Sequence, residues 1–250
     1  MAQRRHVIVG NWKMNGSSVS ARRLADDLAQ RANAQKPLPF DVVICPPFPL
    51  IVPVLESLTG SPLHVGGQDA HTDLQGSYTG DVSPVLLADL GCRYVILGHS
   101  ERRTAHQETS ATVAAKMAAA QKAGLQTIVC VGESQDQRDQ GEDEAIAVVV
   151  DQLLASLPPN VAATHLLVAY EPLWAIGTGR QPKVRDIRTI HRAIRKALGP
   201  CGETTPVLYG GSVTAANALA LLHEPEVDGV LVGGASLDAD SFWAIAEAAR

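Results

Sequence analysis

The sequence has little of several features that would assign a chain to a specialised class. Its 250 residues include four cysteines, Cys45, Cys92, Cys130 and Cys201, and no CxxC pair. Scattered cysteines favour reduced thiols in a cytoplasmic enzyme over a disulfide framework or a zinc site. No apolar run approaches the length of a membrane span, and Met1–Gly10 is too poor in apolar residues for a signal peptide. We therefore expect a cytoplasmic protein without a membrane partner.

The sequence also lacks an excess of positive charge. The chain has 21 lysines and arginines and 26 acidic residues, which gives a net charge of -5. No run of like charges is long enough to act as a tail. Proteins that bind nucleic acid normally collect positive charge on one face, so we expect no nucleic-acid partner. The content of 46% hydrophobic and 19% charged residues is typical of a soluble chain with a sizeable core.

Nucleotide and metal motifs are missing as well. There is no Walker-type GxxxxGK[ST], and the turn after the first predicted strand reads Gly-Asn-Trp-Lys where a dinucleotide fold would usually have GxGxxG. The histidines form no HxH or HExxH pair, and only His99 closely follows a predicted strand. We therefore expect no cofactor and no metal.

What is present is an alternation, repeated eight times, of a short apolar run and a segment of helical period. The predicted strands are His6–Trp12, Asp41–Cys45, Leu63–Gly67, Tyr94–Leu97, Thr127–Val131, Leu166–Tyr170, Pro206–Tyr209 and Gly229–Val232. The predicted helices are Val19–Arg31, Leu50–Leu58, Pro84–Leu90, Thr109–Ala123, Glu142–Leu157, Val184–Leu198, Ala215–Leu222 and Asp240–Ala249. Parallel strands need such crossovers, so the pattern predicts an α/β protein. Eight units without a linker predict one domain, residues 1–250, folded as a closed (β/α)8 barrel with eight parallel strands; an open doubly wound sheet is the alternative.

Reactive side chains follow several of these strands, and in such a barrel the loops after the strands build the site. Asn11 and Lys13 follow the first strand, His99 the fourth and Glu171 the sixth. Lys13 is the only one of the six lysines at a predicted strand end. A Schiff-base mechanism needs a lysine within the barrel, so Lys13 is the one candidate for it. A carboxylate, an imidazole and one lysine at one rim predict proton abstraction next to a carbonyl. Glu101 and Glu133 either take direct roles or orient Lys13, the arginines or Trp174.

The segment after Glu171 has the composition of a lid. Pro172 stiffens the exit from the strand, and the apolar residues that follow, Trp174 among them, are unusual for an idle surface loop. Gly177 and Gly179 supply the backbone freedom that a moving segment needs. We therefore expect a loop that closes over the site.

Glycine-rich turns end the last two strands, at Gly210-Gly211-Ser212 and Gly233-Gly234. Glycines let a ligand approach backbone N–H groups, and neighbouring helix N-termini favour anions, so two such turns suit a phosphate. Without a Walker motif, that phosphate is expected on a small substrate rather than on ATP.

Six motifs in order along the chain resemble the triosephosphate isomerase family. They are Gly-Asn-Trp-Lys-Met-Asn at 10–15, Gly-His-Ser-Glu-Arg-Arg at 98–103, Cys-Val-Gly-Glu at 130–133, Ala-Tyr-Glu-Pro-Leu-Trp-Ala-Ile-Gly-Thr-Gly at 169–179, Tyr-Gly-Gly-Ser-Val at 209–213 and Gly-Val-Leu-Val-Gly-Gly-Ala at 229–235. The resemblance implies a TIM barrel that interconverts dihydroxyacetone phosphate and D-glyceraldehyde 3-phosphate through an enediolate. In this family a glutamate acts as the base, a neutral histidine acts as the electrophile, and a loop closes to exclude water.

The resemblance also assigns roles to individual residues. Glu171 is implied as the base that shuttles the proton, with His99, Asn11 and Lys13 stabilising the enediolate. The residues implied to bind the phosphate of the substrate are Gly177, Ser212, Gly233 and Gly234. By the same resemblance, Tyr209 and Ser212 hold the lid closed, and Glu133 contacts Trp174 when the lid is open.

A long loop, Gln68–Ser83, has no helical or alternating pattern and exceeds a plain connection. By resemblance it docks into a second copy of the chain, brings Thr79 beside the site and makes a homodimer. The chain departs from the commonest family pattern at Asp69, at Asp81 and at Arg180-Gln181-Pro182. Two alternatives remain, namely another phosphosugar isomerase on this barrel, of the kind built on two aspartates, and a non-catalytic binding protein on the same scaffold.

Overall fold

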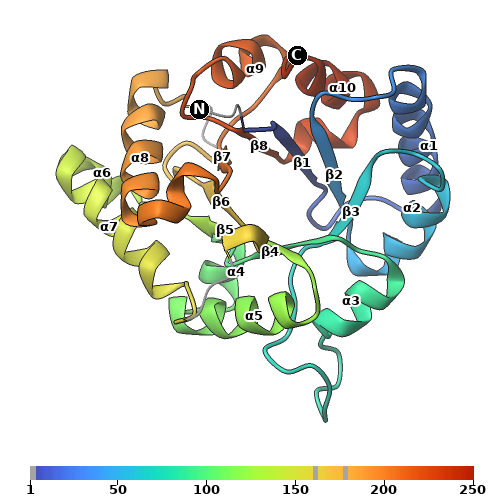
Figure 1. Ribbon diagram of the computed structural model, residues 1–250, viewed down its shortest axis with the longest axis horizontal. Coiled ribbons are helices and arrows are strands. Elements are labelled where there is room, and N and C mark those ends of the chain that lie inside the picture. The colour runs from blue at the N-terminus through green and yellow to red at the C-terminus, as the bar shows by residue number, and fades with distance from the viewer. Residues whose placement is uncertain (1–3, 160–162, 177–179) are drawn as a thin grey trace.

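The computed structural model describes residues 4–159, 163–176 and 180–250, and its strands pair in the order β1 to β8 to close a barrel (Figure 1). The strands β1 to β8 are Val7–Asn11, Asp41–Cys45, His64–Gly67, Tyr94–Leu97, Gln126–Val131, Leu166–Tyr170, Val207–Tyr209 and Gly229–Val232. Every pairing is parallel, including the pairing of β1 with β8 that closes the sheet. The predicted (β/α)8 barrel is confirmed, and the doubly wound alternative is wrong.

Helices surround the barrel on its outside (Figure 1). Those that match predicted helices are α1 Ser18–Ala34, α2 Ile51–Ser57, α3 Pro84–Leu90, α5 Ser110–Lys122, α7 Glu142–Ala155, α8 Val184–Ala197, α9 Ala215–Leu222 and α10 Ala239–Glu247. The 3-10 turns are η1 Phe48–Leu50, η2 Ala163–His165, η3 Gly199–Glu203 and η4 Gly234–Leu237. Across the described ranges, no helix is both long enough and apolar enough to cross a membrane.

Two short helices were not predicted, α4 Ser100–Ala105 and α6 Gln135–Asp139. Neither has a buried residue, so neither shows the apolar stripe by which helical period is recognised. Their starts are fixed by caps instead. The His99 side chain accepts from the amide of Glu101, and Ser134 forms a capping box. Capping within a strand-end loop therefore places both helices at the rim of the barrel.

The core has two layers because successive strand residues point to opposite faces. In β1, Val7 and Val9 belong to the inner cluster that fills the barrel, whereas Ile8 packs in the outer cluster with the helices. Cys130 of β5 lies in the inner cluster and is fully buried, so its thiol packs inside the barrel. The interior is a packed core rather than a pore, so ligands have room only at the rim.

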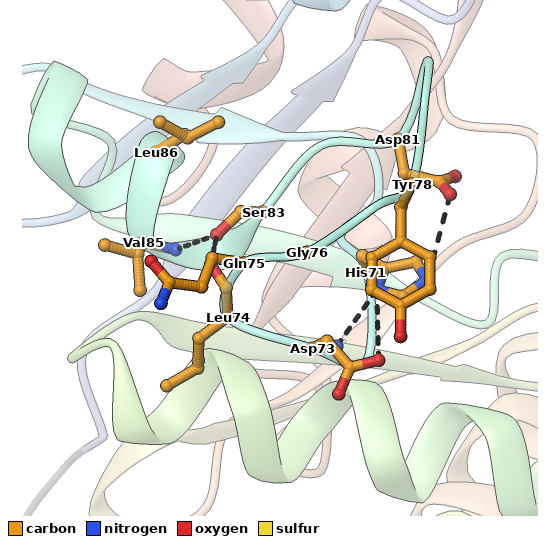
Figure 2. Close-up of a pocket in the computed structure, with 10 residues that line it drawn as sticks. All are labelled: His71, Asp73, Leu74, Gln75, Gly76, Tyr78, Asp81, Ser83, Val85 and Leu86. Atoms are coloured by element: carbon orange, nitrogen blue, oxygen red, sulfur yellow. Dashed lines mark hydrogen bonds and ion pairs between the residues drawn. The ribbon is translucent and has the colours of Figure 1, made fainter.

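The loop Gln68–Ser83 projects beyond the ring of helices next to α3 (Figure 1). It is organised by its own side chains, since the His71 ring lies 4.1 Å from that of Tyr78, centroid to centroid, and within 3.8 Å of the carboxylates of Asp73 and Asp81. These residues line a hollow of about 290 Å³ within the loop (Figure 2). Tyr78 is 46% exposed. The loop is therefore a preformed projection with an exposed aromatic side chain.

Candidate active site

The predicted site residues converge at the rim where the strands end at their carboxyl termini. A pocket of about 580 Å³ is lined by Asn11, Lys13, His99 and Glu171 on one side and by the turns after β7 and β8, with Ser212, Gly233 and Gly234, on the other. Gly177, also expected there, lies outside the described residues. Residues as far apart in the sequence as Asn11 and Gly234 thus share one cavity because the barrel brings every strand end to the same rim.

Glu171 follows β6 and is 2% exposed. Its amide donates to the carbonyl of Val131 at 2.7 Å, which continues the pairing of β6 with β5 and fixes where the side chain begins. Oε2 accepts from the amide of Ser100 at 2.9 Å, and Oε1 accepts from the Ser100 hydroxyl at 3.2 Å. His99 Nε2 lies 2.9 Å from Oε1. The carboxylate is therefore held by donors at the start of α4.

The contact between these two side chains shifts the pKa values of both. Burial raises the pKa of Glu171, but His99 and the hydrogen bonds from Ser100 lower it more, so the net shift is downward. Burial lowers the pKa of His99, yet the Glu171 carboxylate outweighs this and the net shift is upward. His99 Nδ1 accepts from the amide of Glu101 at 3.3 Å, so the proton of the neutral ring lies on Nε2. The pair is an ionised carboxylate and a donating imidazole.

Lys13 follows β1 in a left-handed conformation, with φ of 51°. Residues other than glycine adopt this region rarely, and such strain collects at functional sites. The Asn11 side chain accepts from the Lys13 amide at 3.0 Å, and the Gln68 side chain donates to the Lys13 carbonyl at 2.8 Å. Lys13 Nζ is 2.6 Å from Glu101 Oε1. This contact is the one that an orienting role of Glu101 requires, and Glu101 also lines the pocket, so a direct role stays open.

The turns after β7 and β8 need residues without side chains. A Cβ on Gly210 would lie 3.0 Å from Cγ of Glu171, and a Cβ on Gly211 would lie 2.1 Å from the hydroxyl of Tyr209. Gly233 faces the Lys13 side chain, with Cε 3.4 Å from its ideal Cβ position. The pocket can therefore offer backbone at this end and a lysine ammonium close to it, an arrangement suited to an anion.

The start of the expected lid rests on β5 and α6. Trp174 Nε1 donates to Oε1 of Glu133 at 2.9 Å, as does the hydroxyl of Tyr170, and Arg138 lies 5.7 Å from the centre of the Trp174 ring. Glu133 is fully buried, and burial raises its pKa although these donors oppose the shift. The contact between Glu133 and Trp174 that the resemblance implied is present. Gly177 and Gly179, the expected glycines of the lid, lie outside the described residues.

Sequence reasoning gave no role to two residues that support the site. Ser100 supplies two donors to Glu171, and Gln68 bridges the carbonyls of Lys13 and Cys45 at 2.8 and 2.9 Å. The position of Gln68 at the rim could have been predicted, because it follows β3 directly, as His99 follows β4. The hydrogen bonds of Ser100 could not have been predicted from its motif, since its partner Glu171 is 71 positions away.

A buried ion cluster lies beneath the long loop. Lys116 of α5 is 6% exposed, and its Nζ lies 2.8 and 2.9 Å from the two oxygens of Asp69 and 2.5 Å from Oε1 of Glu108. Arg102 of α4 reaches the same two carboxylates at 2.8 and 2.6 Å. The cluster ties the first residues of the loop to the helix that follows His99, with two charges of each sign.

No group of three or more histidine, cysteine or acidic side chains in the described ranges is arranged to hold a metal ion. The rim instead brings together an ionised carboxylate, an imidazole that donates from Nε2, and a lysine.

An eight-stranded parallel barrel with a carboxylate, an imidazole and a lysine at its rim defines the class as a (β/α)8 barrel enzyme. Comparison with known proteins then specifies the family. Residues 6–249 match the family model described as triosephosphate isomerase. The chain belongs to the triosephosphate isomerase family.

Individual relatives agree over nearly the whole length. The triosephosphate isomerase of Acidiphilium cryptum (strain JF-5) is 49% identical over 255 residues, covering 97% of this chain and 98% of the relative. That of Xanthobacter flavus is 49% identical over 251 residues, covering 99% and 98%. The crystal structure of the triosephosphate isomerase from Bartonella henselae has a TM-score of 0.88 and 38% identity, and the match covers 98% of each chain.

Proposed function

We propose that Glu171, His99, Asn11 and Lys13 carry out the isomerisation that gives the family its name. The chain is an isomerase that interconverts dihydroxyacetone phosphate and D-glyceraldehyde 3-phosphate. The observation that carries the assignment of residues is the 2.9 Å contact of the Glu171 carboxylate with His99 Nε2, in the same pocket as Lys13. A base, a neutral donor and a cation around one cavity meet the needs of an enediolate intermediate.

The reaction needs one base and two stabilising groups. The Glu171 carboxylate takes a proton from C1 of dihydroxyacetone phosphate, and the electrons of that C–H bond form an enediolate. His99 donates from Nε2 to the developing oxyanion, and the Lys13 ammonium stabilises the same charge from the other side of the pocket. The carboxylic acid of Glu171 then returns a proton to C2, while the hydroxyl proton on O1 passes to O2 through His99 Nε2. These two transfers give D-glyceraldehyde 3-phosphate and restore the carboxylate and the neutral imidazole.

The phosphate of the substrate is assigned to the glycine-rich end of the pocket. Backbone groups at Ser212, Gly233 and Gly234 lie there, and Gly177 joins them in the proposal although it lies outside the described residues. Backbone donors bind a phosphate without adding a titratable group, so the acidic chain needs only Lys13 as a local cation. The proposal includes no cofactor and no metal.

The alternative activities are less well supported by the residues. A phosphosugar isomerase built on two aspartates would have acids after β1 and β5, but Asn11 and Lys13 follow β1. Glu133, which follows β5, accepts hydrogen bonds from the side chains of Tyr170 and Trp174. A silent binding protein would not require a carboxylate held by three donors. Neither alternative explains the rim as a whole.

A coupled assay of triose phosphate interconversion tests the proposal. A general base accelerates a reaction by roughly a hundred- to ten-thousand-fold, so Glu171→Gln is expected to lower kcat by at least about a hundredfold. Glu142→Gln, at an exposed position in the first turn of α7, is the matched control and should leave kcat unchanged. A loss smaller than about tenfold in Glu171→Gln would rule out this assignment of the base.

We infer further that residues 1–250 form one domain, that the protein acts in the cytoplasm, and that it pairs with a second copy through Gln68–Ser83. Exposed apolar side chains near this loop support the pairing, namely Tyr78 and, on α3, Val85 and Leu86. Sedimentation equilibrium should give twice the chain mass of 26.4 kDa. Leu86→Glu should shift the protein toward monomers, whereas Leu154→Glu, at a comparably exposed leucine of α7, should not.

A further inference from the structure

A second, smaller cavity lies on the far side of Glu171 from the substrate pocket. Its volume is about 140 Å³, and it is bordered by the ends of β4 and β5 and by α4, α6 and α7. The polar side chains on its wall are Ser100, Arg103, Ser134, Gln137 and Gln152. We call this cavity, defined by these residues together with Cys130 and Val131, the rear compartment.

Glu171 is the residue that borders both cavities and belongs to the acid–base machinery. His99 lines the substrate pocket and is not part of the rear compartment, whereas Ser100 and Cys130 line the rear compartment and not the substrate pocket. The carboxylate contacts His99 and Ser100, since His99 Nε2 lies 2.9 Å from Oε1 and Ser100 donates to both carboxylate oxygens, and its charge acts on the Cys130 thiol. The base therefore separates two spaces, with its reaction partner on one side and neutral donors on the other.

The Cys130 thiol remains neutral in this position. Burial raises its pKa well above the usual range, and the charge of Glu171 raises it further. Arg103 supplies a fixed positive charge on the same wall. Its guanidinium donates to the carbonyls of Gly98 and Cys130 at 2.8 and 3.1 Å and to two serine hydroxyls. Among the described groups that line the rear compartment, the Glu171 carboxylate is thus the one that changes its protonation during the proposed reaction.

The compartment has the size and polarity that ordered water requires. A water molecule needs room for about one probe sphere of roughly 10–15 Å³ and two to four polar partners, and 140 Å³ exceeds this several times. Gln152 Oε1 accepts from the amide of Gly132 at 2.8 Å, while its amide nitrogen has no acceptor among the residues that the structure describes. Ser134, Gln137 and Gln152 are each half-buried, so the outer wall reaches the surface between α6 and α7.

We propose that the rear compartment holds the water with which Glu171 exchanges its proton during turnover. The inference rests on the proposed function, in which Glu171 becomes a carboxylic acid after it deprotonates the substrate. That acid gives its proton to a water molecule in the compartment and receives another proton from it, so the carboxyl group and the water are both regenerated. The exchange proceeds through the rear compartment while the substrate fills the substrate pocket, because Glu171 is the one described residue that lines both cavities.

Isotope transfer in heavy water tests the proposal. When D-glyceraldehyde 3-phosphate is the substrate, product that keeps the original hydrogen reports direct transfer, and product that carries deuterium reports exchange at Glu171. Gln152→Met keeps the length of the side chain but removes its polar groups from the compartment. We expect the deuterated fraction of the product to fall at least twofold. Gln30→Met, the same change at an exposed position of α1, should leave it unchanged.

A second variant covers the case in which Gln152→Met does not fold. Val131→Ile adds one methyl group to the wall and removes no hydrogen-bonding group, so it should also lower the deuterated fraction. An unchanged deuterated fraction in every folded variant would overturn the inference, since the exchange would then take place through the substrate pocket. The two proposals fail separately, because undiminished turnover in Glu171→Gln would refute the base, whereas unchanged labelling with an intact requirement for Glu171 would refute only the rear compartment.

Discussion

His99 Nε2 lies 2.9 Å from Oε1 of Glu171, so the proposed electrophile and the proposed base are hydrogen-bonded to each other in this structure. Each group therefore sets the protonation of the other. The carboxylate favours a proton on the imidazole, and the imidazole favours the ionised carboxylate. A substrate that places its C1 and its carbonyl between them would replace this contact with one bond to each group.

The pKa of His99 should therefore depend on Glu171. Burial alone lowers that pKa, and the Glu171 carboxylate is the main cause of its net rise. In Glu171→Gln the burial remains and the charge is removed, so we expect the His99 pKa to fall. An NMR titration of the imidazole nitrogens measures this directly. Glu101→Gln is the matched variant. Its carboxylate is 3.7 Å from His99 and largely exposed, so the fall should be smaller. An equal or higher pKa in Glu171→Gln would contradict the coupling.

Lys13→Met should impair catalysis and leave the fold intact. Removing one preorganised group that stabilises a developing oxyanion costs about a hundred- to a thousandfold in rate, and Lys13 is the cation assigned to that task. We expect kcat/KM to fall by at least about a hundredfold. Lys122→Met, at an exposed position of α5, controls for the loss of one positive charge. Equal losses in the two variants would show that Lys13 acts only through the net charge of the protein.

Gly233→Ala tests the phosphate end of the pocket. The new Cβ would lie 3.4 Å from Cε of Lys13, an ordinary contact, but the backbone combination of φ -86° and ψ -112° lies outside the regions that residues with a Cβ favour. This strain should lower the thermal unfolding midpoint but leave the chain folded at the assay temperature. The added methyl group would nevertheless enter the space assigned to the phosphate, and one methyl group in a pocket changes discrimination by roughly 10- to 200-fold. We expect KM and the inhibition constant of glycerol 3-phosphate to rise by about tenfold. An unchanged inhibition constant would place the phosphate elsewhere.

The barrel was predictable from the sequence because each strand is a short apolar run that is buried on both faces. Four of the eight predicted strands begin and end at the observed residues, and those around β1, β3, β5 and β7 differ by a single residue at one end or at both. The helices α4 and α6 were not predicted, because polar residues and local caps give them no apolar period.

The site was predictable to the extent that it depends on strand ends. Once eight strands are placed in one barrel, Asn11, Lys13, His99 and Glu171 must share a rim. The donors of Ser100, the burial of Lys116 and the rear compartment were not predictable, since each depends on side chains from different elements packing together. No spacing along the chain encodes a contact between residues 71 positions apart.

Lys116→Met should destabilise the protein strongly. Lys116 is buried and is bound to Asp69 and Glu108, so its loss leaves two buried carboxylates with Arg102 as their remaining cation. Breaking a buried ion pair from one side costs about 3–5 kcal/mol. We expect a clear fall of the thermal unfolding midpoint, which Asp69→Asn added to Lys116→Met should partly restore by removing one of the two charges. Lys122→Met on the same helix is the control. A similar midpoint for both lysine variants would mean that the cluster contributes little.

The same cluster predicts how stability responds to acid. Burial raises the pKa of Glu108, but its bonds to Lys116 and Arg102 lower it more, so the folded-state pKa lies below the ordinary 4.5. The stabilisation from ionised Glu108 is therefore complete above about pH 4.5 and is lost as the pH falls through the lower folded-state value. Burial of Asp69 shifts its pKa upward, so its own contribution runs in the opposite direction.

Replacing Glu108 separates the two carboxylates. Glu108→Gln cannot ionise, so it should be less stable than the parent near neutral pH, and the difference should shrink as the pH falls below about 4.5. Urea unfolding at a series of pH values measures that difference. Glu142→Gln, exposed at the start of α7, should match the parent near neutral pH. A deficit in Glu108→Gln that stays constant across the acid range would mean that the side chain acts through packing, because only its charge is titrated there.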